Sequence, residues 1–107
     1  MTSRLAAAAL SLSLLAAPVA VAGGDPDPAP IFKARCAVCH GLDGKGQTPA
    51  GKALKVRDLG SPEVQQRSDA ELAATIAEGK GKMPAFKSTL GAGDIEALVG
   101  LIRTLEK

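Results

Sequence analysis

The feature that most constrains this chain is Cys36-Ala37-Val38-Cys39-His40, in which a histidine directly follows two cysteines three residues apart. On a helix, residues i and i+3 share a face, so both thiols can reach neighbouring vinyl groups on one edge of a porphyrin and form thioethers. His40 then comes beneath the iron. This spacing is the motif of c-type haem attachment. We therefore predict one covalently attached haem c, held by Cys36 and Cys39, with His40 as an axial ligand of the iron.

Other uses of the two cysteines fit less well. A thioredoxin-like pair usually opens a helix after a buried strand, but residues 31–35 have no β-branched run and are predicted to be helical. A structural zinc site takes about four ligands, whereas the chain has two cysteines and one histidine. A structural disulfide between the two cysteines is an alternative in an oxidising compartment, although it leaves His40 without a role.

Residues 1–22 have the pattern of a cleaved secretory signal peptide. Arg4 supplies the positive charge, residues 5–17 form an apolar run, and residues 20–22 fit the small-x-small cleavage pattern. The apolar run is shorter than the roughly 20 residues of a bilayer span, although a retained anchor is the competing interpretation. We predict export to a bacterial periplasm, without stable membrane insertion after cleavage.

The mature chain is predicted to be one small all-α domain. A mobile Pro/Asp-rich leader is expected over residues 23–30, followed by the haem domain over residues 31–107. Phe32 and Phe86 are its only aromatic residues, and domains of this size commonly need a disulfide, metal or cofactor to be stable. A buried porphyrin would supply the flat apolar mass that the side chains lack.

Capping residues and apolar periodicity predict where the helices lie. Asp27-Pro28 can start the first helix, which ends at the haem motif, and Ser61 and Ser68 are expected to cap later ones. The later helices are expected over residues 50–54, 62–66, 69–78 and 92–105. The side chains expected to be buried on the last two are Leu72, Ala73, Ile76, Ala77, Ile95, Leu98, Val99 and Ile102. The glycine-rich residues 41–46 follow no strand, so we expect them to turn the backbone and not to bind phosphate.

A second ligand to the iron is predicted in the Gly- and Pro-rich loop of residues 79–86. Met83 is the only methionine of the mature chain. Methionine is usually core filler, but its thioether is a soft ligand that suits ferrous iron. A His/Met pair also raises the reduction potential of a haem. We therefore predict Met83 as the second axial ligand.

Charge excludes one class of partner and suggests another. Loss of Arg4 leaves 12 basic and 11 acidic residues with no basic block, so nucleic-acid binding is not expected. Arg57 and Lys52 are candidates to hold the haem propionates. Six lysines lie in segments expected to flank the haem: Lys45, Lys52, Lys55, Lys80, Lys82 and Lys87. They form either a docking patch for an acidic redox partner or an ordinary solvated surface.

Together these motifs resemble the class I cytochromes c, specifically the small bacterial monohaem type. The resemblance extends from Ile31 to Leu105 and is based on Cys36–Gly41, Asp43-Gly44-x-Gly46, Lys82–Phe86 and Leu98-Val99-x-x-Ile102-Arg103. It implies a cytochrome c-like fold of three to five helices around the haem, with the first and last helices packed together. It also implies axial ligation by His40 and Met83, with the Pro49 carbonyl accepting a hydrogen bond from the other ring nitrogen of His40. Leu101 departs from the family, which often has an aromatic residue in the last helix.

With both axial positions filled, the iron has no open site for a substrate. We therefore expect a soluble periplasmic monomer that carries one electron between redox protein partners, cycling between Fe(III) and Fe(II), and not an enzyme. Two alternatives stay open. One is a ligand-binding or weakly peroxidatic haem protein with a labile Met83, and the other is a dedicated haem subunit of a periplasmic dehydrogenase or respiratory complex.

Overall fold

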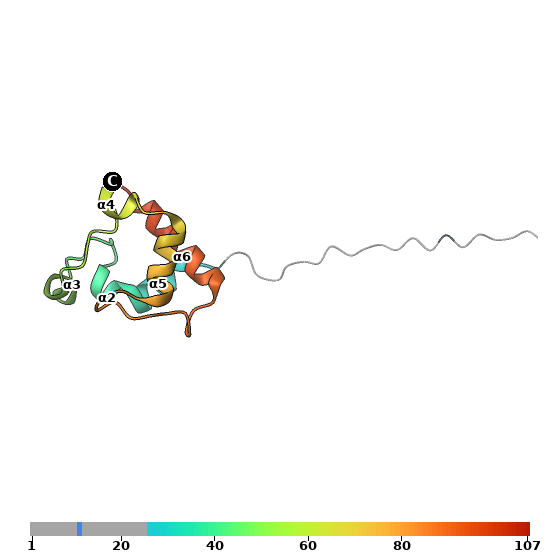
Figure 1. Cartoon of the computed structure of the whole chain (residues 1–107), viewed down its shortest axis with the longest axis horizontal. Coiled ribbons are helices and arrows are strands. Elements are labelled where there is room, and N and C mark those ends of the chain that lie inside the picture. The colour runs from blue at the N-terminus through green and yellow to red at the C-terminus, as the bar shows by residue number, and fades with distance from the viewer. Residues whose placement is uncertain (1–10, 12–25) are drawn as a thin grey trace, which may run out of the picture.

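The computed structural model describes Ser11 and residues 26–107, which fold into short helices joined by loops (Figure 1). The helices are α1 (Pro28–Ile31), the π-helix η1 (Phe32–Cys36), α2 (Ala37–His40), α3 (Pro49–Leu54), α4 (Pro62–Gln65), α5 (Asp69–Glu78) and α6 (Ala92–Thr104). The first three are consecutive, so the described chain has five helical segments, at the upper end of the predicted range. Its only strand-like pairing is an isolated bridge between Lys80 and Met83. The predicted all-α fold is confirmed.

The first helical segment begins earlier than the predicted domain boundary. Asp27 caps α1 by accepting a hydrogen bond from the Ala29 N–H (3.0 Å), and Pro28 occupies the first helical position. The last three residues of the predicted leader are therefore helical. The predicted signal peptide, apart from Ser11, lies outside the described residues, as do residues 23–25 of the leader. No helix in the part that the structure describes is long and apolar enough to cross a bilayer.

Helices α4 and α5 begin where their predicted capping residues place them, whereas α3 begins one residue earlier than expected, after a cap that the sequence analysis did not identify. Thr48 caps α3, and Ser68 caps α5 by accepting a hydrogen bond from the Glu71 N–H (3.1 Å). Ser61 occupies the N-cap position of α4, but its hydroxyl makes no capping hydrogen bond and is buried without a partner. The sequence thus predicted the start of α4 correctly, while the expected capping contact of Ser61 is not formed.

The core lies where α5 and the first helical segment pack against α6. Both α1 and α5 contact α6, which confirms the implied packing of the first helix on the last. Leu98, on α6, is the most deeply buried large side chain, and Leu101 packs partly buried at the edge of the same cluster. The buried core side chains are Phe32, Val64, Leu72, Ile76, Leu90, Ile95, Leu98, Val99 and Ile102. The predicted stripe of α6 is therefore buried completely, whereas Ala73 and Ala77 of α5 are only partly buried.

Candidate functional site

A cavity of about 540 Å³ opens beside this core. Its volume falls within the roughly 300–1,000 Å³ that is usual for ligand and cofactor sites. Most of its wall is apolar, with contributions from Phe32, Leu54, Val56, Leu59, Val64, Leu72, Ile76, Phe86, Leu98 and Ile102. Four of the five predicted site residues line it, namely Cys36, Cys39, His40 and Met83. The fifth, Pro49, is exposed and does not line the cavity.

The two cysteines reach the cavity from η1 and α2. Cys36 ends the π-helix, whose wider turn is closed by a hydrogen bond from the Ala37 N–H to the Phe32 carbonyl. Such π-helical turns are often found at functional sites. Both thiols are half-buried and neither forms a disulfide. Burial raises the pKa of the Cys36 thiol, and the positive charge of Arg35 opposes that rise.

His40 is the last residue of α2, and its side chain lines the same cavity. Burial lowers the pKa of its imidazole, because the low-dielectric surroundings disfavour the charged form. The neutral imidazole is the form that ligates metals. Its Nδ1 is buried and has no hydrogen-bond partner among the described residues, so the predicted hydrogen bond to the Pro49 carbonyl is not formed here. A buried nitrogen without a partner is rare in folded proteins and marks an incomplete polar site.

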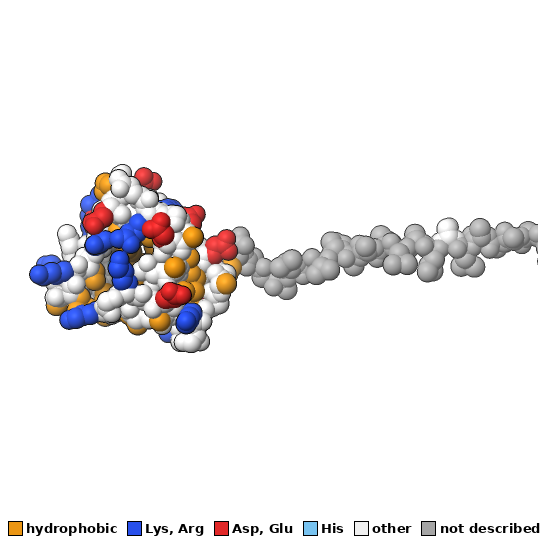
Figure 2. All heavy atoms as spheres, viewed as in Figure 1, with side chains coloured by type: hydrophobic (Ala, Val, Ile, Leu, Met, Phe, Trp, Pro, Cys, Tyr) orange, Lys and Arg blue, Asp and Glu red, His pale blue; other side chains and the backbone are white. Residues whose placement is uncertain are grey.

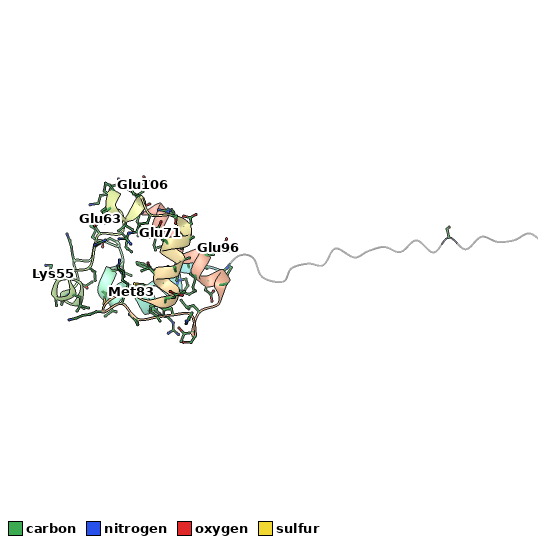
Figure 3. All side chains as sticks on the ribbon, viewed as in Figure 1. Lys55, Glu63, Glu71, Met83, Glu96 and Glu106 are labelled. Atoms are coloured by element: carbon green, nitrogen blue, oxygen red, sulfur yellow. The ribbon has the colours of Figure 1, made fainter. Side chains whose placement is uncertain are left out.

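Met83 belongs to a loop that backbone hydrogen bonds hold at both ends. The N–H groups of Lys80 and Met83 each donate to the other's carbonyl (3.2 and 3.0 Å). Farther along, the N–H groups of Phe86 and Lys87 donate to carbonyls at the C-terminal end of α5 (3.1 and 3.0 Å). Gly79 permits this path, since its φ is +76° and a Cβ there would lie 2.5 Å from the Met83 carbonyl oxygen. The loop therefore has one well-defined course, which brings Met83 to the cavity (Figure 3).

The charged residues around the cavity all have the same sign. Among the described residues that line it, six are cations and none is acidic. The six are Arg35, Lys55, Arg57, Arg67, Lys80 and Lys82. Lys and Arg side chains also gather over the α3 end of the face drawn in Figure 2.

The sequence predicted only part of this charged rim. Lys55, Lys80, Lys82 and Arg57 line the cavity as expected. Three other lysines were predicted to flank the haem but do not line the cavity: Lys45, Lys52 and Lys87. Lys52 is therefore poorly placed for the propionate role suggested for it. Arg35 and Arg67 were missed, although the position of Arg35 directly before Cys36 could have revealed it.

Comparison with known proteins settles the family. The sequence model of the family described as "Cytochrome C oxidase, cbb3-type, subunit III" matches residues 25–102. The chain belongs to this family. The cytochrome is also similar to cytochrome c6 of Microcystis aeruginosa, with 40% identity over 78 residues that cover 71% of this chain and 90% of the relative. Cytochrome c6 of Nostoc sp. is 36% identical over 83 residues, covering 78% of this chain and 72% of the relative.

A solved structure supports the same assignment. The KustC0563 c-type cytochrome matches with a TM-score of 0.71 and 32% sequence identity, covering 77% of this chain and 100% of that one. The protein is thus a small monohaem class I cytochrome c that carries one covalently bound haem c with its iron. It is an electron-transfer protein that works with redox partners, and not an enzyme.

The cavity residues of this cytochrome suit a covalently bound haem. Two free thiols, an imidazole and a thioether face one space whose wall is otherwise mostly apolar. The unpartnered Nδ1 of His40 shows that the polar surroundings of this imidazole are incomplete in the protein chain alone. This donor set fits an iron porphyrin better than a structural zinc ion, which would need about four ligands.

Proposed function

We propose that this cytochrome is a periplasmic one-electron carrier whose haem iron is bound by His40 and Met83. The observation that carries the proposal is that one cavity presents Cys36, Cys39, His40 and Met83, although Met83 lies more than forty residues beyond the motif in the sequence. A neutral imidazole and a thioether together favour the ferrous state and raise the reduction potential. The Pro49 carbonyl is the proposed acceptor for His40 Nδ1, since α3 packs against α2.

The protein chain contributes rigidity and a dry environment. When bound, the haem supplies an iron that accepts and releases a single electron. The apolar side chains keep water from the metal, and the hydrogen bonds of the Met83 loop hold the thioether in place. This fixed loop favours a carrier over the ligand-binding alternative, which requires Met83 to leave the iron readily.

The absorption spectrum of protein purified from the periplasm tests the proposal. Haem should stay with the chain through denaturation, because Cys36 and Cys39 hold it by thioethers. We expect sharp low-spin ferrous bands and the weak far-red ferric band of sulfur ligation. Mass spectrometry should place the mature N-terminus at Gly23, as the signal-peptide pattern predicts. A high-spin spectrum would instead indicate an open iron site, and a chain without covalent haem would refute the proposal.

Docking of a redox partner is proposed at the mouth of the cavity. Val38 and Leu54 line the cavity and are exposed (68% and 37%), so the mouth combines apolar side chains with the cationic rim. This chemistry suits a partner with an acidic surface around its own redox centre. The charge would guide approach and orientation, while the apolar side chains would contribute short-range contact. The carrier itself is proposed to be a monomer.

Replacing Lys80 by glutamate is expected to slow electron transfer with an acidic redox protein by roughly 3- to 10-fold at low ionic strength. The change reverses a charge at the cavity mouth, and salt should reduce the difference by screening it. Stopped-flow kinetics over a range of ionic strength measure this effect. Lys87→Glu is the matched control, because Lys87 is exposed but does not line the cavity. A wild-type rate that does not change with ionic strength would remove this docking surface from the proposal.

A second candidate function is that of a haem subunit in a respiratory complex. The description of the matching family, an oxidase subunit, favours it. The ligands and the electron chemistry would be the same in both cases. The two differ in assembly, because a subunit would co-purify with stoichiometric partners under mild conditions and a free carrier would elute alone.

A further inference from the structure

Arg67 differs from the other five cations that line the cavity. It is the only one of the six that is not exposed. The ion pairs of the described residues are Arg57–Glu63, Arg103–Asp69 and Lys107–Asp58, so Arg67 has no anionic partner among them. Arg67 as a residue is partly buried, and a cation that loses water needs an anion or hydrogen-bond acceptors to compensate it. Arg67 is therefore the lining cation with the most to gain from an anion placed in the cavity.

The backbone at Arg67 is held firmly in place by Arg103 of α6. The Arg103 guanidinium donates to the Arg67 carbonyl (2.6 Å) and to the Gln65 carbonyl (2.9 Å), and it pairs with Asp69 (2.8 Å). These contacts attach the turn between α4 and α5 to the last helix. The Gln65 side-chain amide adds a hydrogen bond to the Ile102 carbonyl (2.9 Å). Arg103 thus fixes the backbone of this turn, and the Arg67 side chain makes none of the ion pairs found among the described residues although Arg67 lines the cavity.

Arg57 differs from Arg67 in being exposed and in already having an acidic partner. It also lines the cavity, but its side chain is 52% exposed and pairs with the exposed Glu63 at 3.1 Å. An exposed, already compensated guanidinium has less to gain from a second carboxylate. Of the candidates to bind an anion of the cofactor, Arg67 is therefore better placed than Arg57 or Lys52.

We propose that Arg67 binds a propionate carboxylate of the haem and that Arg103 acts as its positioning residue. This inference rests on the proposed function, because it requires haem in the cavity. The propionates are the peripheral anions of a haem, and the planar fork of a guanidinium can hold a carboxylate through two parallel hydrogen bonds. A cation held beside the haem stabilises the added electron of the ferrous state, so Arg67 should raise the reduction potential.

The test compares holoprotein variants by two measurements, the midpoint potential and the propionate bending mode in resonance Raman spectra. Arg67→Gln is expected to lower the potential and shift the propionate mode. Arg67→Lys keeps the charge, so its midpoint potential should stay close to that of the wild type. Its propionate mode should still be shifted, because an ammonium lacks the planar fork. Arg103→Lys should shift the mode with a smaller effect on the potential. Lys55→Gln is the control, since it removes one rim charge from an exposed side chain.

The outcomes separate this inference from the proposed function. An unchanged propionate mode in Arg67→Gln, or a larger drop in potential in Arg57→Gln, would overturn the role of Arg67. If Arg67→Gln does not accumulate, the propionate mode of Arg67→Lys becomes the deciding measurement. A mode that is unchanged from the wild type in Arg67→Lys would then overturn the inference. An unchanged mode in Arg103→Lys would overturn the positioning role. Wild-type protein that lacks covalent low-spin haem would instead refute the proposed function, whatever the variants show.

Discussion

Replacing Met83 by alanine is expected to leave the haem attached and to open one side of the iron. The thioethers of Cys36 and Cys39 do not involve Met83, so covalent haem should survive denaturation as in the wild type. Loss of the thioether should abolish the far-red ferric band and convert the spectrum to high spin. The reduction potential should fall, because the soft sulfur ligand that favours ferrous iron is gone.

Carbon monoxide binding to the ferrous protein gives the second readout for Met83. Wild-type protein should bind little or none at neutral pH, since the proposed Met83 ligand lies in a loop that backbone hydrogen bonds hold at both ends. The Met83→Ala protein should bind it stoichiometrically. Lys82→Ala is the matched control, because it changes an exposed neighbour in the same loop and should keep the far-red band. A far-red band that persists in Met83→Ala would show that Met83 is core filler and that another residue binds the iron.

Gly51→Ala is expected to destabilise the fold by at least about 3 kcal/mol, at the upper end of the usual cost of overpacking. Gly51 is buried in α3, where a Cβ would lie 2.3 Å from the Cys39 carbonyl oxygen and 2.4 Å from that of Gly46. Both obstacles are backbone atoms, which cannot rotate away as a side chain can. Relief would require α3 to move off α2, and this would disturb the haem motif and the hydrogen bond from the Thr48 hydroxyl to the Cys39 carbonyl.

Gly100→Ala is the matched control for Gly51→Ala. Gly100 is an exposed position inside α6, and no other described part of the chain lies within 4 Å of a Cβ added there. Alanine there should stabilise the protein by about 0.4–1 kcal/mol, because it reduces the conformational entropy of the unfolded chain. Urea unfolding of both holoproteins, followed by far-UV circular dichroism, gives the two free energies. Equal effects from the two substitutions would contradict the close packing of α3 on α2.

Local features of the chain were predictable from the sequence. Asp27 and Ser68 cap helices through contacts within three residues, and the apolar period of α6 already identifies its buried face. The Cys36–His40 motif is equally local, because one helical turn sets the spacing of its thiols. Ser61 shows the limit even here. Its position predicted the helix start, but its hydroxyl is buried without a hydrogen-bond partner, which the local sequence did not predict.

The sequence by itself determined the all-α class, the haem motif and the second ligand candidate, because each depends on residue type and on spacing over a few residues. Only the tertiary structure showed that Met83 shares a cavity with His40, that Lys52 does not line this cavity, and that Arg67 does. Arg67 follows a four-residue helix and depends on a carbonyl contact from Arg103, 36 residues later. The positions of these residues relative to the cavity result from how the helices pack across the domain, so no local sequence pattern predicts them.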